Sequence, residues 1–210
     1  QKSLILPNNC IVKNRMKLVF ASNNKHKLDE VCQILPIGVD VLSLQDVGFL
    51  QEIEETGSTL EENSAIKARV VWQWLLDNAL LDGIDGDTGL EIKSLNGAPG
   101  VRTARWASED AIDINNRQKA LLELQGIEDR FARFRTVVSL ILGGKLEQVE
   151  GIVNGRIALA EMGDGGFGYD PVFIPEGYDV TFACLSAEEK NTISHRGKAM
   201  AELRKILEKL

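Results

Sequence analysis

The sequence contains few residues of the kinds that build zinc sites and disulfide frameworks. Its 210 residues include three Cys (Cys10, Cys32 and Cys184) and two His (His26 and His195). The three Cys are far apart and odd in number, so they match neither a disulfide framework nor the paired spacing of a Cys-rich metal site. Two His disfavour a His-rich zinc site. We interpret the Cys as reduced structural thiols of a cytosolic protein.

The chain also lacks a long hydrophobic run and an excess of positive charge. No apolar run is long enough to span a membrane, and the apolar run near the N-terminus is too short for a secretory signal. The 24 Lys and Arg against 31 Asp and Glu leave a net charge of −7, which disfavours general nucleic-acid binding through a basic surface. An anionic ligand would need a local basic pocket. We expect a cytoplasmic protein.

Regular structure is predicted from Met16 onward. We interpret residues 1–15 as an N-terminal extension or tag, followed by a single domain of residues 16–210. Apolar patterns and turn residues predict a strand at 17–21, a helix at 25–35, a strand at 39–44, a helix from Ser58 to about Asn78 with Glu61 in its capping box, a helix from Ser108, strands at 131–138, 146–153 and 156–162, a capping box at Ser186 and Glu189, and a last helix capped by Ser194.

An acidic stretch lies near the middle of the chain. Asp82, Asp85 and Asp87 fall within six residues and are interleaved with Gly. Crowded carboxylates can hold a hard cation through oxygen or take a proton from water. Asp and Gly are also the ordinary residues of turns, so an acidic surface turn explains the same composition.

A polar turn lies between the first predicted strand and the first predicted helix. Ser22, Asn23 and Asn24 would lie at the N-terminus of that helix, where free N–H groups and the helix dipole favour an anion, and Lys25 and Lys27 add positive charge. Taken alone, these residues are explained more simply as a helix cap with a solvated first turn.

A Gly-rich loop at residues 163–171 contains a formal G-x-G-x-x-G pattern. A dinucleotide fingerprint needs a helix to open there, but Pro171 and extended residues follow, so we reject that interpretation. The rings of Phe167 and Tyr169 could stack on a planar base or fill the core beneath the loop. The predicted last helix has His195 and Arg196 in its first turn, where the dipole disfavours cations. This placement suggests an anionic or carbonyl-bearing partner nearby.

Read together, these segments resemble the inosine triphosphate pyrophosphatase family from Met16 to the C-terminus. The resemblance is carried, in the expected order, by residues 22–27, 87–90 with 96–100, 165–171, and 189–191 with 194–196, and is extended by 54–57 and 62–63. It implies hydrolysis of aberrant purine nucleoside triphosphates (ITP, dITP and XTP) to the monophosphate and pyrophosphate. It further implies an α/β fold whose long mixed sheet floors a cleft between two lobes, a Mg²⁺ cofactor and a homodimer.

The resemblance also implies roles for individual residues. The triphosphate would lie on Ser22, Asn23, Asn24, Lys25, His26 and Lys27, joined by Lys67, which is otherwise a solvated lysine in the middle of a helix. Asp87 would accept a proton from the attacking water and bind metal together with Glu54 or Glu55, and Thr88 would contact the substrate. The base would be held by Phe167, Gly168, Tyr169 and Asp170 and read by Lys190, His195 and Arg196.

Gly86 departs from the family pattern, which usually has an acid directly before the Asp of Asp87–Thr88. One carboxylate of the metal site is then missing, unless Asp85 takes its place. Two alternatives therefore stay open: a nucleotide-binding protein with weak or no turnover, and a pyrophosphatase of another modified nucleotide. A nucleic-acid-binding module fits least, because the chain is acidic.

Overall fold

A computed structural model of the chain describes residues 16–35, 38–78 and 83–209; the predicted extension 1–15, Asp82 and Leu210 lie outside this part. The described residues form five α-helices: α1 (Lys25–Ile34), α2 (Leu60–Asp77), α3 (Asp113–Glu123), α4 (Ala187–Ile193) and α5 (His195–Leu207). They also form seven strands: β1 (Met16–Phe20), β2 (Val39–Ser43), β3 (Gly83–Ile92), β4 (Pro99–Gly100), β5 (Phe131–Leu142), β6 (Lys145–Ile157) and β7 (Phe173–Pro175). None of the helices in these ranges combines the length and the apolar character needed to cross a bilayer.

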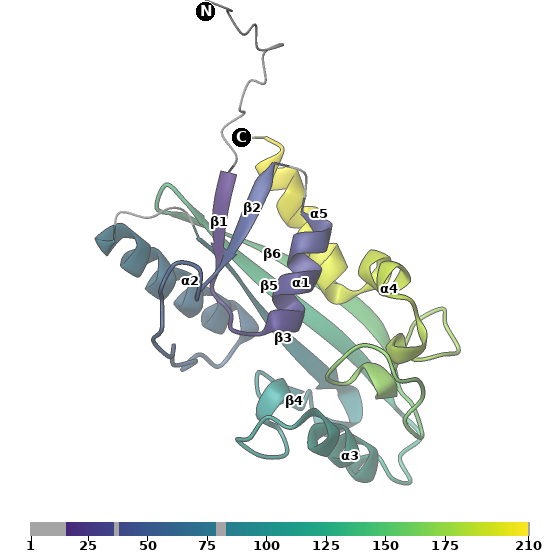
Figure 1. Ribbon diagram of the computed structural model, residues 1–210. Coiled ribbons are helices and arrows are strands. Elements are labelled where there is room, and N and C mark those ends of the chain that lie inside the picture. Colours follow the sequence, from purple (N-terminus) through teal and green to yellow (C-terminus); the bar gives the residue numbers. More distant parts are fainter. Residues whose placement is uncertain (1–15, 36–37, 79–82, 210) are drawn as a thin grey trace, which may run out of the picture.

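The strands form one mixed sheet, which confirms the predicted α/β class. The strand order is β2-β1-β3-β5-β6-β7, and β4 pairs with the far end of β3. β1 is parallel to both β2 and β3, whereas β3, β5, β6 and β7 run antiparallel to their neighbours. Figure 1 shows α1 and α5 on one face of the sheet, and β4 with α3 at the far end of the long strands. Helix α2 packs on the opposite face.

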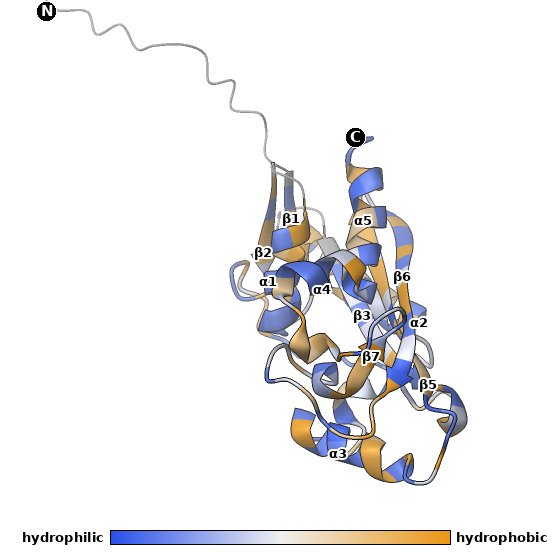
Figure 2. Ribbon diagram, turned by 90° about the vertical axis from the view of Figure 1, so that its right-hand side faces the viewer, coloured by the Kyte–Doolittle hydropathy of each residue, from blue (hydrophilic) through white to orange (hydrophobic). Residues whose placement is uncertain are grey.

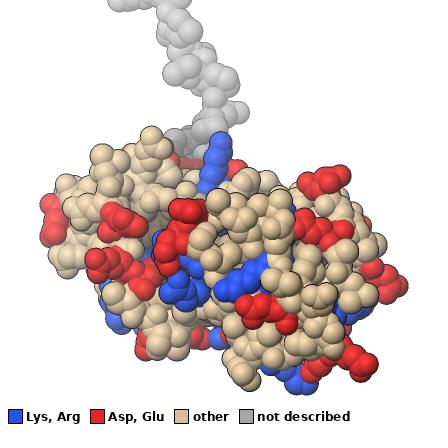
Figure 3. Space-filling model, turned by 90° about the horizontal axis from the view of Figure 1, so that it is seen from below, with Lys and Arg blue, Asp and Glu red and all other residues tan. Residues whose placement is uncertain are grey.

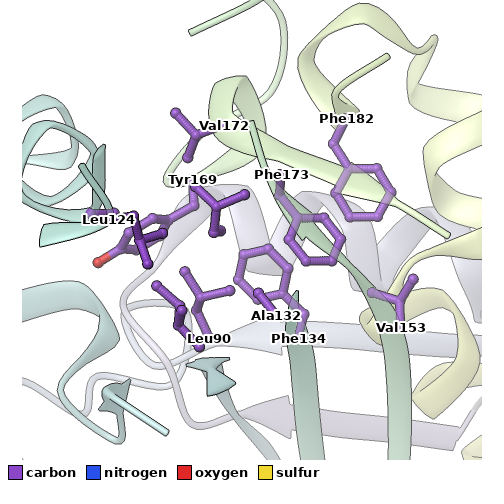
Figure 4. Close-up of a cluster of buried hydrophobic side chains, with 12 residues drawn as sticks. Leu90, Leu124, Ala132, Phe134, Val153, Tyr169, Val172, Phe173 and Phe182 are labelled. Carbon is purple, nitrogen blue, oxygen red and sulfur yellow. The ribbon is translucent and has the colours of Figure 1, made fainter. Parts of the chain in front are cut away.

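Three buried clusters hold these layers together. One packs α1 and α5 on β1 and β5, and a second packs α2 on β1. The third lies at the far end of the long strands, where the rings of Phe134, Phe173 and Phe182 pack together in the same cluster as Tyr169 and Leu90 (Figure 4). Figure 2 shows that β6 and α5 each carry both hydrophobic and hydrophilic residues, as expected for elements with one buried side.

The acidic stretch is the middle of the central strand β3 and not a surface turn. Among the described residues, β1 pairs with β3 at Gly83 and Ile84, and β4 pairs with it at Leu90 and Glu91. Between these pairs, the edge of β3 opposite β5 faces no strand of the described sheet. Because side chains alternate along a strand, Asp85 and Asp87 share one face of β3. The fold thus presents both carboxylates at an open stretch of strand.

Three predicted element boundaries are wrong. The capping box of α2 is formed by Thr59 and Glu62, one residue later than predicted. Helix α3 starts at Asp113 and not at Ser108, because residues 109–110 form a turn, Ala111 has a left-handed backbone with φ 52° and Ile112 is extended. The predicted strand at 156–162 is not separate, since its first two residues end β6 and the rest lies outside strands. The Gly143–Gly144 hairpin turn, the Ser186–Glu189 capping box and the Ser194 cap are confirmed.

The close packing of α5 on β6 depends on Gly151. A Cβ at this position would collide with the backbone of His195 and Ala199. We therefore expect Gly151→Ala to lower the free energy of unfolding by about 1–3 kcal/mol or more, measured by thermal and denaturant unfolding. Gly86→Ala is the matched control, because a Cβ there would meet its nearest atom, Val138 Cγ2, at an ordinary 3.5 Å. Equal stability of Gly151→Ala and wild type would contradict this role.

Candidate active site

Two neighbouring pockets lie along the open stretch of β3, and they share Lys27, Thr88 and Ala104. The aromatic pocket is further lined by Asn24, Thr103, Asp113, Phe134, Phe167, Gly168, Tyr169, Asp170, Lys190, His195 and Arg196. The carboxylate pocket is further lined by Glu55, Gly57, Asn63, Asp87, Val101, Arg102, Arg105 and Glu109. Figure 3 shows Lys and Arg side chains gathered in the middle of one face, with Asp and Glu beside them. The acidic chain thus has a local basic site.

Lys67 of α2 is buried against β3 and is not a solvated lysine. Its Nζ lies 3.1 Å from Glu55 Oε1, 3.3 Å from Asp87 Oδ1 and 3.4 Å from Asp85 Oδ2. Burial by itself would lower the pKa of Lys67, but the carboxylates of Asp85, Asp87 and Glu55 outweigh burial and raise it. Lys67 therefore carries a positive charge and links α2 to the acidic strand.

The two Asp of β3 keep unused hydrogen-bonding capacity. Within the described residues, neither carboxylate oxygen of Asp85 has a hydrogen-bond partner, and Oδ2 of Asp87 has none. Burial raises the pKa of Asp85 to about 6, although Lys67 and Lys27 oppose the shift. Burial, reinforced by the nearby Lys67, lowers the pKa of Lys27 to about 8. Buried acceptors without partners fit a cation, because leaving them unpaired is costly.

The carboxylates surround the Lys67 ammonium and do not form a ready metal cage. In the described ranges, no group of three His, Cys, Asp or Glu is arranged to hold a metal ion. Of the two predicted partners of Asp87, Glu55 lines the carboxylate pocket with it, whereas Glu54 is not among the lining residues. Of the predicted metal ligands, Glu55 and Asp87 are therefore the two that could hold a cation from this pocket; Glu109 also lines it but pairs with Arg102.

The turn before α1 is both a helix cap and part of the site. Asn24 Oδ1 accepts the N–H of Lys27 at 3.1 Å, and Ser22 Oγ accepts the N–H of Asn24 at 3.3 Å. The ring of His26 stacks on Phe167, with centroids 5.0 Å apart. Asn23 and Lys25 are exposed and are not among the residues that line either pocket. Of the predicted triphosphate cradle, Asn24 and Lys27 thus lie at the pockets.

Two buried cations form one wall of the aromatic pocket. Lys190 Nζ lies 2.8 Å from Asp170 Oδ2 and 3.1 Å from Glu30 Oε1, and Arg196 also pairs with Glu30. Lys190 Nζ is 4.7 Å from the centroid of the Phe167 ring, and the Arg196 guanidinium is 5.4 Å from it. Burial lowers the pKa of Arg196 to about 10. Burial also raises the pKa of Asp170, although the positive charge of Lys190 opposes this shift. These donors lie where a flat ligand would stack.

His195 contributes a neutral ring to the same pocket. It is 3% exposed, and its ring stacks on Phe134 with centroids 4.6 Å apart. Burial, followed by the nearby Lys190 and Lys27, lowers the pKa of His195 well below its ordinary value, so the ring is uncharged at neutral pH. Its Nδ1 has no hydrogen-bond partner among the described residues. This nitrogen can therefore bond to a polar group of a ligand.

The two aromatics of the Gly-rich loop have different roles. Tyr169 is buried in the core, and its hydroxyl donates to the Thr103 carbonyl at 3.0 Å. Phe167 is partly exposed at the pocket, between His26 and the two buried cations. The core interpretation is thus correct for Tyr169, whereas stacking of Phe167 on a base stays a prediction.

Comparison with known proteins identifies the family of the chain. The model of the Ham1 family matches residues 18–206. The chain belongs to the Ham1 family. The dITP/XTP pyrophosphatase of Flavobacterium psychrophilum is 47% identical over 188 residues, which are 90% of this chain and 97% of that protein. The dITP/XTP pyrophosphatase of Bacillus subtilis is 46% identical over 194 residues, covering 90% of this chain and 96% of that protein.

Solved structures of Ham1 proteins have the same fold. The Ham1 protein of Coxiella burnetii is 36% identical, with a TM-score of 0.84 over 93% of this chain and 100% of that one. The Ham1 protein of Staphylococcus aureus is 38% identical, with a TM-score of 0.82 over 91% of this chain and 98% of that one. These findings confirm the family predicted from the sequence.

Sequence analysis missed several residues of this Ham1 site. Glu30 holds both buried cations, and the only local signal was its place one turn after Lys27 on α1. Arg102 and Arg105 line the carboxylate pocket from the loop after β4. Asp85 is a possible substitute at the metal site by its sequence position, and the structure shows it as a partner of Lys67.

Proposed function

We propose that this chain hydrolyses non-standard purine nucleoside triphosphates, such as ITP, dITP and XTP, to the monophosphate and pyrophosphate. One observation carries the proposal: a pocket with a stacking ring and buried donors opens beside a pocket with Lys, Arg and carboxylates, and both share Lys27 and Thr88. A nucleotide has these two halves, a flat base and an anionic tail. The relatives named dITP/XTP pyrophosphatase support the same activity.

The aromatic pocket would bind the base. Phe167 offers a ring face for stacking, and Lys190 and Arg196 offer only donors. Hypoxanthine and xanthine carry a carbonyl oxygen at position 6, which can accept from such donors. Adenine carries an amino group there, so it would set donor against donor and leave buried groups unpaired. A mismatch of this kind discriminates strongly between substrates.

The carboxylate pocket would bind the phosphates. Lys27 lines the pocket from the first turn of α1, where free backbone N–H groups favour an anion. The Nζ atom of Lys67 on α2 lies 3.3 Å from Oδ1 of Asp87. Arg102 and Arg105 add charge from the facing loop. These cations would offset the negative charge of the triphosphate as the bond to pyrophosphate breaks.

Asp87 and Glu55 would hold Mg²⁺, because both line the pocket and one oxygen of Asp87 has no partner. Bound there, the ion would neutralise phosphate charge and orient the phosphates. Asp87 would also accept the proton of the water that attacks the α-phosphorus. From the family resemblance we further expect a cytoplasmic homodimer, which analytical ultracentrifugation would test for assembly.

The proposal is tested by incubating the protein with dITP, XTP, GTP and ATP, with and without Mg²⁺, and separating the products. We expect monophosphate and pyrophosphate from dITP and XTP in the presence of Mg²⁺, and little product from ATP. Release of single phosphates would place the attack at another phosphorus. Tight binding of dITP without product would favour the alternative of a nucleotide-binding protein, and preference for a modified pyrimidine nucleotide would favour the other alternative.

A further inference from the structure

Asp85 is a buried carboxylate to which the proposed reaction gives no task. It is 0% exposed, and neither of its oxygens has a hydrogen-bond partner in the part of the chain that is described. Its one ion pair in this part is with Lys67, at 3.4 Å from Nζ to Oδ2. A buried charge of this kind is costly unless it is compensated, so its presence calls for a reason.

Asp85 does not substitute for an acid at position 86. Side chains alternate along β3, and a Cβ on Gly86 would point at Val138 Cγ2 and Thr136 Cγ2, 3.5 and 3.9 Å away. Asp85 and Asp87 instead both face Lys67 of α2. Asp85 thus lies beside Lys67, on the face of β3 opposite to the one that a side chain at position 86 would occupy.

The three carboxylates around Lys67 differ in how a ligand can reach them. Glu55 and Asp87 line the carboxylate pocket, and their side chains are 30% and 8% exposed. Neither Lys67 nor Asp85 is among the lining residues, and their side chains are 8% and 0% exposed. A cation or a water molecule that enters the pocket therefore reaches Glu55 and Asp87 and can replace Lys67 as their partner. Asp85 stays paired with Lys67.

We propose that Asp85 is a positioning residue that holds the Lys67 ammonium beside Glu55 and Asp87, directly behind the wall of the phosphate-binding pocket, while these two carboxylates act on other groups. Lys27 lies close enough for its charge and that of Lys67 to affect each other. Without Asp85, Lys67 would face this second cation with no permanent counter-charge, and its side chain would turn away from the pocket. This inference rests on the proposed function, since it assigns the anion that Lys67 binds.

Asp85→Asn tests the proposal, because it removes the charge and keeps the shape. We expect the KM for dITP to rise about tenfold with a smaller change in kcat, since a binding contact and not a reacting group is disturbed. We expect pyrophosphate binding in the absence of metal, measured by calorimetry, to weaken about tenfold for the same reason. Asp179→Asn is the charge-matched control, because the Asp179 side chain is fully exposed. Circular dichroism and thermal unfolding check that each variant folds.

A double-mutant cycle shows whether Asp85 acts through Lys67. Adding Asp85→Asn to Lys67→Met should change KM and pyrophosphate affinity by less than about twofold, because the residue to be positioned is gone. Mn²⁺ affinity, measured by electron paramagnetic resonance, should be the same in Asp85→Asn and wild type. Additive effects, or a tenfold loss of Mn²⁺ affinity, would overturn the proposal, the latter by making Asp85 a metal ligand.

Different results would contradict the proposed function and the proposed role of Asp85. If wild type binds pyrophosphate, and Asp85→Asn weakens that binding, but no dITP is hydrolysed, the proposed function fails and the role of Asp85 stands. If wild type hydrolyses dITP and Asp85→Asn leaves KM and pyrophosphate affinity unchanged, the role of Asp85 fails alone. Absence of pyrophosphate binding by wild type would overturn the role of Asp85 as well.

Discussion

Replacing Asp87 with asparagine is expected to reduce the turnover of dITP by about 10²–10⁴-fold, the range that a lost general base produces. The substitution keeps the size of the side chain but removes its capacity to take a proton. It also removes one of the two carboxylates proposed to bind Mg²⁺ and one partner of Lys67. The measurement is the steady-state release of monophosphate and pyrophosphate at saturating dITP and Mg²⁺.

The structure supplies a control and a second readout for Asp87→Asn. Asp179→Asn makes the same change in charge at an exposed position and should retain wild-type turnover. Binding of inosine monophosphate, measured by calorimetry, should change little in Asp87→Asn, because Asp87 does not line the aromatic pocket. Turnover within about tenfold of wild type would show that another group accepts the proton.

The sequence predicts a role for Asp87, but it does not predict the conformation of the chain around this residue. Asp and Gly are depleted in strands, so local preference favours a turn between Gly83 and Gly89. Pairing with β5 along the whole of β3 overrides that preference. The Asp and Gly residues of β3 are held in the strand by pairing with β5 along one edge. At the site, the other edge of β3 faces no described strand.

The predicted N-cap of α2, Ser58, is wrong for a simpler reason. Ser58 is followed three residues later by Glu61, and Thr59 is followed three residues later by Glu62, so the sequence contains two overlapping capping boxes. Only the backbone conformation selects between them. In the structure Thr59 is the cap, and Ser58 donates from its N–H and its hydroxyl to Glu62 instead.

The partners of the buried cations show a different limit of sequence analysis. The first turn of α5 predicted an anionic or carbonyl-bearing partner near Arg196, and the structure provides Glu30 of α1. The two residues are 166 positions apart, and they meet because α1 and α5 pack on the same face of the sheet. No local pattern indicates such a contact. The need for a partner could therefore be predicted, but its identity could not.

This arrangement of cations predicts a change in substrate preference. Lys190→Met should lower kcat/KM for dITP by about 10²-fold or more, because it removes a buried donor and leaves Asp170 and Glu30 without their shared cation. The loss for dATP should be much smaller, since adenine offers no acceptor at position 6. The ratio of kcat/KM for dITP to that for dATP, measured in competition, should thus fall toward one.

Two comparisons separate loss of recognition from loss of structure in Lys190→Met. Lys145→Met removes a lysine whose side chain is 78% exposed, and it should change neither the ratio nor the stability. In Lys190→Met, the free energy of unfolding should fall by several kcal/mol, because the substitution leaves a buried carboxylate charge without its partner. The ratio must therefore be measured under conditions in which the variant is folded. A folded Lys190→Met protein with the wild-type ratio would mean that Lys190 holds the pocket together and that base choice depends on other groups of the aromatic pocket, such as the unpaired Nδ1 of His195.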